Sequence, residues 1–141
     1  SLGYSIMGPP WSRLTAYDLN AGKILWQIPN GSVTQLGDAG KNVGSVAPRG
    51  GVVVPAGGLV FVATYSDRKF RAYDQDNGKV LWEFNLPSAS EGVPAVYQAA
   101  GRQYIAIPVA GNGLFQPRPP ADGSIPPAAP GQYMAFALPR R

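Results

Sequence analysis

Cysteine and histidine are both absent from the 141-residue chain. Without cysteine there can be no disulfide framework and no thiol nucleophile. Without either residue, Cys/His metal sites and catalytic triads with a histidine base are excluded as well. No apolar run approaches the roughly 18 residues of a membrane-spanning helix. Catalysis by the usual cysteine- or histidine-based sets is therefore not expected from this segment.

Charge is also sparse and unclustered. Lys, Arg, Asp and Glu make up 14% of the residues, with 12 basic and 8 acidic side chains and a net charge of +4. The only adjacent basic pairs are Arg68-Lys69 and Arg140-Arg141. Nucleic-acid-binding surfaces concentrate their basic residues in a patch or stripe, so we expect no nucleic-acid partner.

Glycine and proline, in contrast, are abundant. The chain has 18 Gly and 15 Pro, alongside 45% hydrophobic and 11% aromatic residues. Frequent turn residues between short apolar runs are typical of many short strands. This amount of apolar material is enough to build a core. The composition therefore predicts an all-β fold.

One eleven-residue motif occurs twice. The sequence AYDLNAGKILW begins at Ala16, and AYDQDNGKVLW begins 56 residues later at Ala72, with seven of the eleven positions identical. Internal repeats of this kind indicate a solenoid or a propeller. The chain is thus expected to contain copies of one structural unit.

Each copy of the motif predicts a β-hairpin. The Asp can accept hydrogen bonds from N–H groups within its own turn, and the Gly can adopt the positive φ that reverses the chain. The small Ala lets a neighbouring sheet approach, and the Trp is expected to dock on that sheet, burying about 150–250 Å². These residues are Ala16, Asp18, Gly22 and Trp26 in the first copy and Ala72, Asp74, Gly78 and Trp82 in the second.

The remaining strands are expected at regular intervals, at 51–54, 59–64, 93–98, 103–107 and 132–138. Propeller blades have four strands each. On this count, residues 1–30 are the end of one blade, 44–86 a complete blade, and 92–141 a last blade without its outer strand. The predicted fold is a partial β-propeller of about two and a half four-stranded antiparallel blades.

Three stretches carry a resemblance to a known family. They are GGVVVPAGGLVFVATYSDRKFRAYDQDNGKVLWEFNLP from Gly50, VPAVYQAAGRQYIAIPVAGNG from Val93, and GQYMAFALP from Gly131. In this order they resemble the C-terminal blades of pyrroloquinoline-quinone (PQQ)-dependent dehydrogenases, most of all the membrane quinoprotein glucose dehydrogenase type.

The resemblance implies the properties of a longer parent protein. These are an eight-bladed propeller, bound PQQ and calcium, and oxidation of a sugar or alcohol by hydride transfer to the quinone, with electrons passed to ubiquinone or a cytochrome. It also implies a periplasmic location. The family's catalytic base and ion ligands lie upstream of such a segment, so this one is expected to have no catalytic residue and to bind neither PQQ nor metal by itself.

Two loops match family positions near the quinone. The first is Arg49-Gly50-Gly51, where relatives have a bulky apolar or aromatic residue before Gly-Gly. The second is Gly111-Asn112-Gly113, where membrane relatives often have a His in place of Asn112. The resemblance implies cofactor-binding roles for these six residues. The alternative for Arg49 is a solvated surface side chain.

Two other segments are expected at the surface. Asp67, Arg68 and Lys69 fall at a predicted hairpin tip and are expected to be solvated. The Pro-rich loop 114–130 cannot bury a core and is expected to run over the surface. Its alternative role is a lid or a docking surface for an electron acceptor.

The partners follow from the open-ended fold. The remaining propeller blades of the parent chain are expected to cover this segment, and in isolation its unpaired strand edges predict self-association. Two alternatives remain open. One is a parent that is a non-catalytic propeller scaffold and binds protein partners; the other is a ring assembled from copies of the 141 residues.

Overall fold

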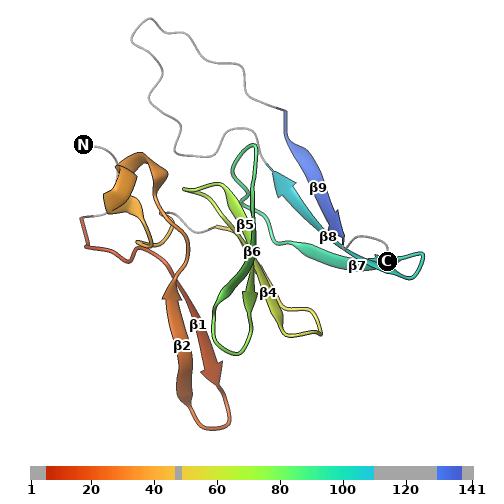
Figure 1. Ribbon diagram of the computed structural model, residues 1–141, viewed down its shortest axis with the longest axis horizontal. Helices are drawn as coiled ribbons and strands as arrows, with labels where there is room; N and C mark the ends of the chain where they lie inside the picture. The colour runs from red at the N-terminus through yellow and green to blue at the C-terminus, as the bar shows by residue number, and fades with distance from the viewer. Residues whose placement is uncertain (1–5, 47–48, 110–129, 138–141) are drawn as a thin grey trace, which may run out of the picture.

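The computed structural model describes residues 6–46, 49–109 and 130–137, and all the regular structure there except one short helix is β-strand. The strands form three separate antiparallel sheets (Figure 1). The first sheet has β1 (Arg13–Asp18) and β2 (Lys23–Pro29); the second has β3 (Val52–Val53), β4 (Leu59–Thr64), β5 (Lys69–Asp74) and β6 (Val80–Asn85); the third has β7 (Ala95–Ala99), β8 (Arg102–Val109) and β9 (Gln132–Ala137).

This architecture confirms the all-β, partial-propeller prediction. The strand order in the second sheet is β3-β4-β5-β6, and in the third it is β7-β8-β9, so every neighbouring pair is consecutive in sequence. The sheets lie side by side and do not close on one another (Figure 1). Their strands fall within 1–30, 44–86 and 92–141, although the bounds of those units remain a prediction.

The repeated motif forms the β1–β2 and β5–β6 hairpins. Ala16 pairs with Trp26 and Ala72 with Trp82, and in each hairpin the register shifts directly after the Ala. The same local sequence thus produces the same register and the same bulge. Both tryptophans therefore leave their sheets in equivalent directions.

The second sheet is covered on both faces. Successive side chains of a strand point to opposite faces of its sheet, so each strand contributes to both contacts. One face packs on the first sheet, and the other packs on the third. The first cluster contains Val60, Val62 and Tyr73 with Leu14 and Ile28 against them. The second cluster contains Ala63, Phe70, Leu86, Ile105, Ile107 and Val109, with Phe61, Val96, Met134 and Phe136 against them.

The turns lie at two opposite ends of the sheets. The β1–β2, β3–β4 and β5–β6 turns point to the lower end in Figure 1, which we call the hairpin end. The opposite end, the connection end, carries segment 30–46, residues 49–51, the β4–β5 turn and segment 86–94, because strand direction alternates along the chain.

A short 3-10 segment, η1 (Thr34–Gly40), was not predicted from the sequence. Its helical conformation is broken at Gly37, where φ is +57°. The N–H of Val33 donates to the carbonyl of Gly40 at 2.8 Å. Val33 is fully buried and anchors the segment. The local sequence has no helical apolar period, so packing against the rest of the chain determines this element.

Candidate functional site

The indole of Trp26 extends from the first sheet onto the β5–β6 turn of the second. Its Nε1–H donates to the backbone carbonyl of Gln75 at 2.9 Å. A Cβ built on Gly78 would lie only 2.8 Å from Cε3 of the indole, so the ring rests directly on the glycine backbone. Gly78 also has a φ of +72°, a conformation that favours glycine. One glycine therefore reverses the chain and makes room for the indole.

The motif aspartates are occupied within their own turns. Oδ1 of Asp18 accepts from the backbone N–H groups of Asn20 at 2.9 Å and Ala21 at 3.0 Å. Oδ1 of Asp74 accepts from the N–H of Asp76 at 2.8 Å. Side-chain oxygens that bond to the chain two or three residues on stabilise tight turns. Both carboxylates thus have a local structural role.

The second motif tryptophan lies in a different environment. Trp82 packs edge-on against Phe70 and Phe136, with ring centroids 5.9 and 5.6 Å apart. It remains 39% exposed, and its indole N–H makes no hydrogen bond within the described residues. Unlike Trp26, which rests on a hairpin turn, Trp82 therefore packs on an aromatic side chain of its own sheet, Phe70, and on one of the next sheet, Phe136.

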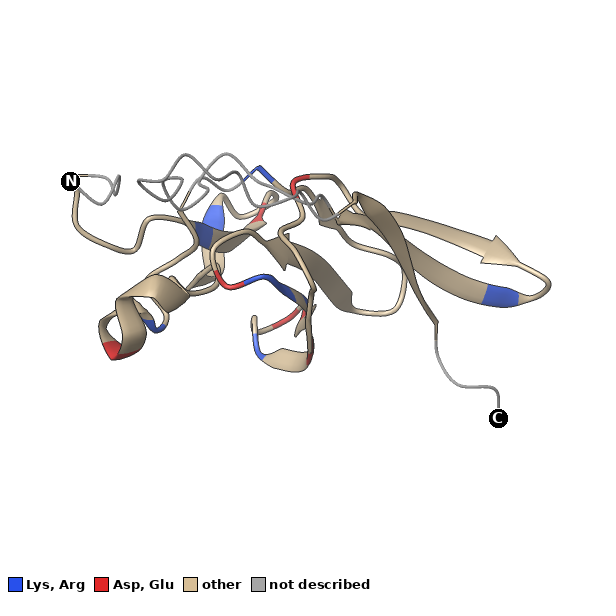
Figure 2. Cartoon of the chain, turned by 90° about the horizontal axis from the view of Figure 1, so that it is seen from above, with Lys and Arg blue, Asp and Glu red and all other residues tan. Residues whose placement is uncertain are grey.

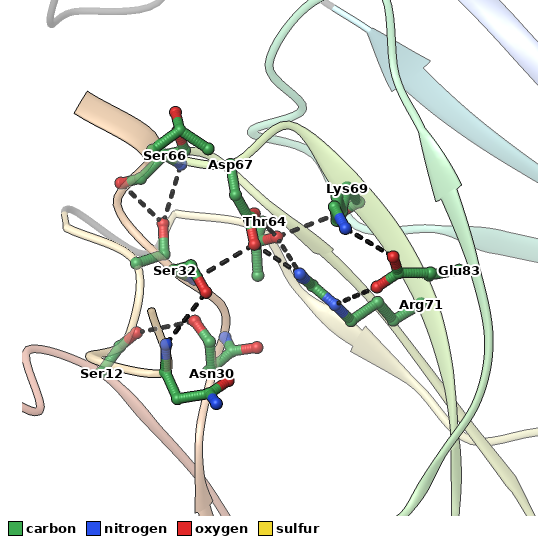
Figure 3. Close-up of polar contacts among 12 residues, drawn as sticks. Ser12, Asn30, Ser32, Thr64, Ser66, Asp67, Lys69, Arg71 and Glu83 are labelled. Atoms are coloured by element: carbon green, nitrogen blue, oxygen red, sulfur yellow. Dashed lines mark hydrogen bonds and ion pairs between the residues drawn. The ribbon is translucent and has the colours of Figure 1, made fainter. Parts of the chain in front are cut away.

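A buried polar network joins the β4–β5 turn to segment 30–46 at the connection end (Figure 3). Its centre is Asp67, whose carboxylate accepts hydrogen bonds from the Thr64 hydroxyl, the Arg71 guanidinium and, at 3.1 Å, the backbone N–H of Ser32. The Asp67 side chain is 1% exposed. A carboxylate this deeply buried needs such partners, because an unpaired buried charge is strongly unfavourable.

The network continues from Arg71 to the outer strand. Nε of Arg71 lies 3.4 Å from the Glu83 carboxylate, whose other oxygen lies 2.5 Å from Nζ of Lys69. Burial alone would lower the pKa of Arg71, but the hydrogen bond and charge of Asp67 raise it above the usual value. The hydrogen bond from Lys69 lowers the pKa of Glu83. Both shifts favour the charged forms of Arg71 and Glu83.

This network corrects one prediction from the sequence. Asp67 was expected to be solvated at a hairpin tip, but it is buried, whereas its neighbour Arg68 is exposed as expected. The burial comes from segment 30–46, which crosses over the β4–β5 turn: the Ser32 N–H bonds to Asp67, and the Thr34 hydroxyl donates to the carbonyl of Ser66 at 3.2 Å. The sequence gives no sign of this contact between distant segments.

The first predicted quinone-facing loop lies beside the same turn. Arg49 is exposed. A Cβ on Gly50 would lie 2.9 Å from the carbonyl oxygen of Ala63, and a Cβ on Gly51 would lie 2.5 Å from the Val93 side chain. Both glycines therefore allow close packing of the protein on itself. Of the three residues, Arg49 alone presents a charged group outward.

The second predicted loop, Gly111-Asn112-Gly113, lies outside the described residues, as does the Pro-rich segment except for Pro130. Within the part of the chain that is described, no three His, Cys, Asp or Glu residues come together as a metal site. No helix there has the length and apolar character needed to span a membrane. Figure 2 shows the charged residues scattered over the chain.

Comparison with known proteins gives the family. A family model for the β-propeller domain of PQQ-type glucose/ethanol/alcohol dehydrogenases matches residues 1–105. The chain belongs to the PQQ-dependent dehydrogenase family. The resemblance seen in the sequence is thereby confirmed, including the glucose dehydrogenase type: the segment is 30% identical over 112 residues to quinoprotein glucose dehydrogenase of Escherichia coli, covering 76% of this chain and 14% of that protein.

Other relatives of this PQQ-dehydrogenase segment have different named substrates. It is 39% identical over 137 residues to the large subunit of glycerol dehydrogenase from Gluconobacter oxydans, covering 93% of this chain and 17% of the relative. It is 36% identical over 118 residues to quinate/shikimate dehydrogenase (quinone) from Acinetobacter baylyi, covering 79% and 15%. The segment thus spans about a sixth of the relatives that it matches.

A solved structure shows the same arrangement of strands. Quinohemoprotein alcohol dehydrogenase from Comamonas testosteroni superposes with a TM-score of 0.59 at 25% identity, over 89% of this chain and 16% of that one. The PQQ-dehydrogenase segment is therefore similar to a limited arc of a larger protein.

The two motif glycines provide a matched pair for testing the indole contact. Gly22 and Gly78 have similar positive φ values, but a Cβ meets nothing within 4 Å at Gly22 and meets Trp26 at Gly78. Gly22→Ala should cost only the backbone strain, about 1–2 kcal/mol. Gly78→Ala should cost about 1–3 kcal/mol more, because the ring must move. Urea denaturation of the 141-residue chain at fixed concentration measures both; equal losses would contradict the contact.

The polar network predicts a second difference in stability. Asp67→Ala leaves the buried Arg71 guanidinium without its main partner and should reduce the free energy of unfolding by about 3–5 kcal/mol. Glu83→Ala removes a half-exposed partner of the same Arg71 and should cost no more than about 1 kcal/mol. The same denaturation assay applies. A loss at Glu83 as large as that at Asp67 would show that the buried pair does not dominate.

Proposed function

We propose that residues 1–141 form an arc of the propeller of a PQQ-dependent sugar or alcohol dehydrogenase. The observation that carries the proposal is the family match over residues 1–105, which contain both copies of the tryptophan hairpin. When bound, PQQ would accept hydride from the carbon of a substrate hydroxyl while a base outside this segment takes the hydroxyl proton, and the electrons would then pass to ubiquinone or a cytochrome. The segment itself supplies architecture and part of the quinone-facing rim.

The names of the relatives support a polyhydroxylated substrate. They include dehydrogenases of glycerol, quinate or shikimate, and glucose. Each of these molecules carries a secondary hydroxyl group or a ring hydroxyl. We therefore propose a sugar or polyol as substrate class for the parent protein.

The described residues fit only part of a quinone site. When bound, PQQ supplies the hydride acceptor of the reaction. Of the residues in the Arg49–Gly51 loop, Arg49 can hold an anionic group through its planar guanidinium, while the two glycines are packed against protein atoms. No carboxylate cluster for calcium is present among the described residues. The quinone and its ion are therefore assigned mainly to the parts of the parent outside this segment.

The uncovered face of the third sheet supports the remaining blades as partners. When Ala135 in the third sheet is aligned with Ala72 in the second, Tyr133 occupies the position equivalent to Phe70. Phe70 is 0% exposed, whereas Tyr133 is 85% exposed. A further blade of the parent would cover Tyr133 as the third sheet covers Phe70.

We also propose the periplasm as the location of the parent protein, on the family resemblance. On composition, we propose that segment 114–130 is a surface loop.

The function is tested with the full-length parent protein. Titration calorimetry should show binding of PQQ in the presence of calcium, and dye reduction with glucose, glycerol or quinate should depend on both. Removal of calcium by a chelator should abolish turnover, and added calcium should restore it. A full-length protein with no heat of quinone binding would instead support the non-catalytic scaffold.

The open face and edges also predict how the segment behaves alone. Sedimentation of the 141-residue chain should show species larger than the monomer, because unpaired edges and exposed apolar faces associate. Tyr133→Lys, on the uncovered face, should shift the distribution toward monomer, whereas Leu19→Lys, on the exposed β1–β2 turn, should not. A clean monomer at high concentration would contradict both self-association and assembly into a ring of copies.

A further inference from the structure

An asparagine directly precedes the glycine on which the indole of Trp26 rests, so the β5–β6 turn contains the pair Asn77-Gly78. In an Asn-Gly pair the backbone nitrogen of the glycine can attack the side-chain carbonyl carbon of the asparagine, because glycine has no side chain to hinder the approach. Asn77 is exposed, whereas Gly78 is buried beneath the indole. The electrophile is therefore open to solvent and the nucleophile is covered.

Hydrogen bonds engage both reacting groups. The N–H of Gly78 donates to the backbone carbonyl of Asp74 at 2.9 Å. Nδ2 of Asn77 donates to Oδ2 of Asp74 at 3.0 Å, and Oδ1 of Asn77 accepts from the N–H of Lys79 at 2.8 Å. The attack requires the Gly78 nitrogen to lose the proton that it donates to Asp74, and it releases Nδ2, which is bonded to the same residue. Asp74 therefore restrains both the nucleophile and the leaving group.

Among the described residues, the other Asn-Gly pair is Asn30-Gly31, and both of its members are buried. A Cβ on Gly31 would lie 3.0 Å from Cγ2 of Thr64, so this glycine is packed against β4. The next residue, Ser32, is bonded to Asp67 through its N–H. Asn30 can therefore react only when segment 30–46 leaves the β4–β5 turn. It serves as an internal reference for general opening, independent of the β5–β6 turn.

We propose that Asn77 is a site of spontaneous deamidation, which the docked Trp26 and the side chain of Asp74 keep slow. The Gly78 nitrogen forms a bond to Cγ of Asn77, the bond from Cγ to Nδ2 breaks, and Nδ2 leaves as ammonia with the proton that the Gly78 nitrogen gave up. Water then opens the cyclic imide at either carbonyl and leaves aspartate or isoaspartate. No electrons are transferred, and the inference does not depend on the proposed function.

The isoaspartate product would disturb the contact that protects the site. It carries the backbone through the side-chain carbon and so lengthens the turn by one methylene. The unmodified turn holds Gly78 at a φ of +72° under the indole, whose N–H donates to the carbonyl of Gln75 at 2.9 Å. The new carboxylate would also join Asp74 and Asp76 in one turn, where like charges repel. Deamidation should therefore loosen the joint between the first two sheets.

The first test measures deamidation in the full-length protein by peptide mass spectrometry after incubation in mildly alkaline buffer. Trp26→Ala should speed conversion of Asn77 by about tenfold, equivalent to the loss of one hydrogen-bonded contact, and should leave Asn30 unchanged. Trp82→Ala removes an indole that packs on Phe70 and Phe136 and not on this turn, and it should leave the Asn77 rate unchanged. Equal acceleration of Asn77 by the two variants would overturn the role of the docked indole.

A second pair of variants decides the matter if Trp26→Ala unfolds the protein, which equal acceleration at Asn30 would reveal. Asp74→Asn should speed conversion of Asn77 by about fivefold through the loss of one hydrogen bond, whereas Asp18→Asn, at the same place in the first motif copy, should not. An unchanged Asn77 rate in Asp74→Asn would overturn the protection by Asp74. The isoaspartate form of aged wild type should unfold at a lower urea concentration than the unmodified protein, and equal midpoints would overturn the loosening of the joint.

Discussion

The contact between an indole and a glycine backbone couples the first two sheets. Trp26 needs a neighbour without a side chain, and the turn needs a residue with positive φ; Gly78 meets both requirements. The nearby carbonyl of Gln75 then satisfies the indole N–H, which would otherwise be costly to bury. This fit holds the first sheet against the β5–β6 turn of the second.

The two joints of the second sheet are chemically different. Both joints contain an apolar cluster, and the face toward the first sheet also carries the buried Arg71–Asp67 pair, whose two members both belong to the β4–β5 hairpin of the second sheet. If Ala135 is aligned with Ala72, Met134 stands where Arg71 stands, opposite Ile107. Buried ion pairs contribute little net stability, but their partners must match. The pair therefore fixes the β4–β5 turn, on which segment 30–46 packs through the Ser32 N–H.

Sequence reasoning succeeded where local chemistry determines structure. The hairpins follow from residues within one motif, and the strands were placed to within a few residues, although 51–54 shortened to Val52–Val53. It failed at Asp67 and at η1, because both depend on segment 30–46 meeting a turn over thirty residues away. For the site, the resemblance indicated Arg49 and its two glycines, whose cofactor role stays a prediction, whereas the buried partners of Asp67 have no signal in the local sequence.

The distance along the chain between Trp26 and its acceptor has a consequence for biosynthesis. The indole N–H and the carbonyl that it meets are 49 residues apart. A ribosome that adds about 5–20 residues per second therefore exposes the first hairpin for several seconds before its docking turn exists. During that interval Trp26 is available to chaperones or to neighbouring nascent chains. The first hairpin therefore cannot complete its packing until the second motif has been made.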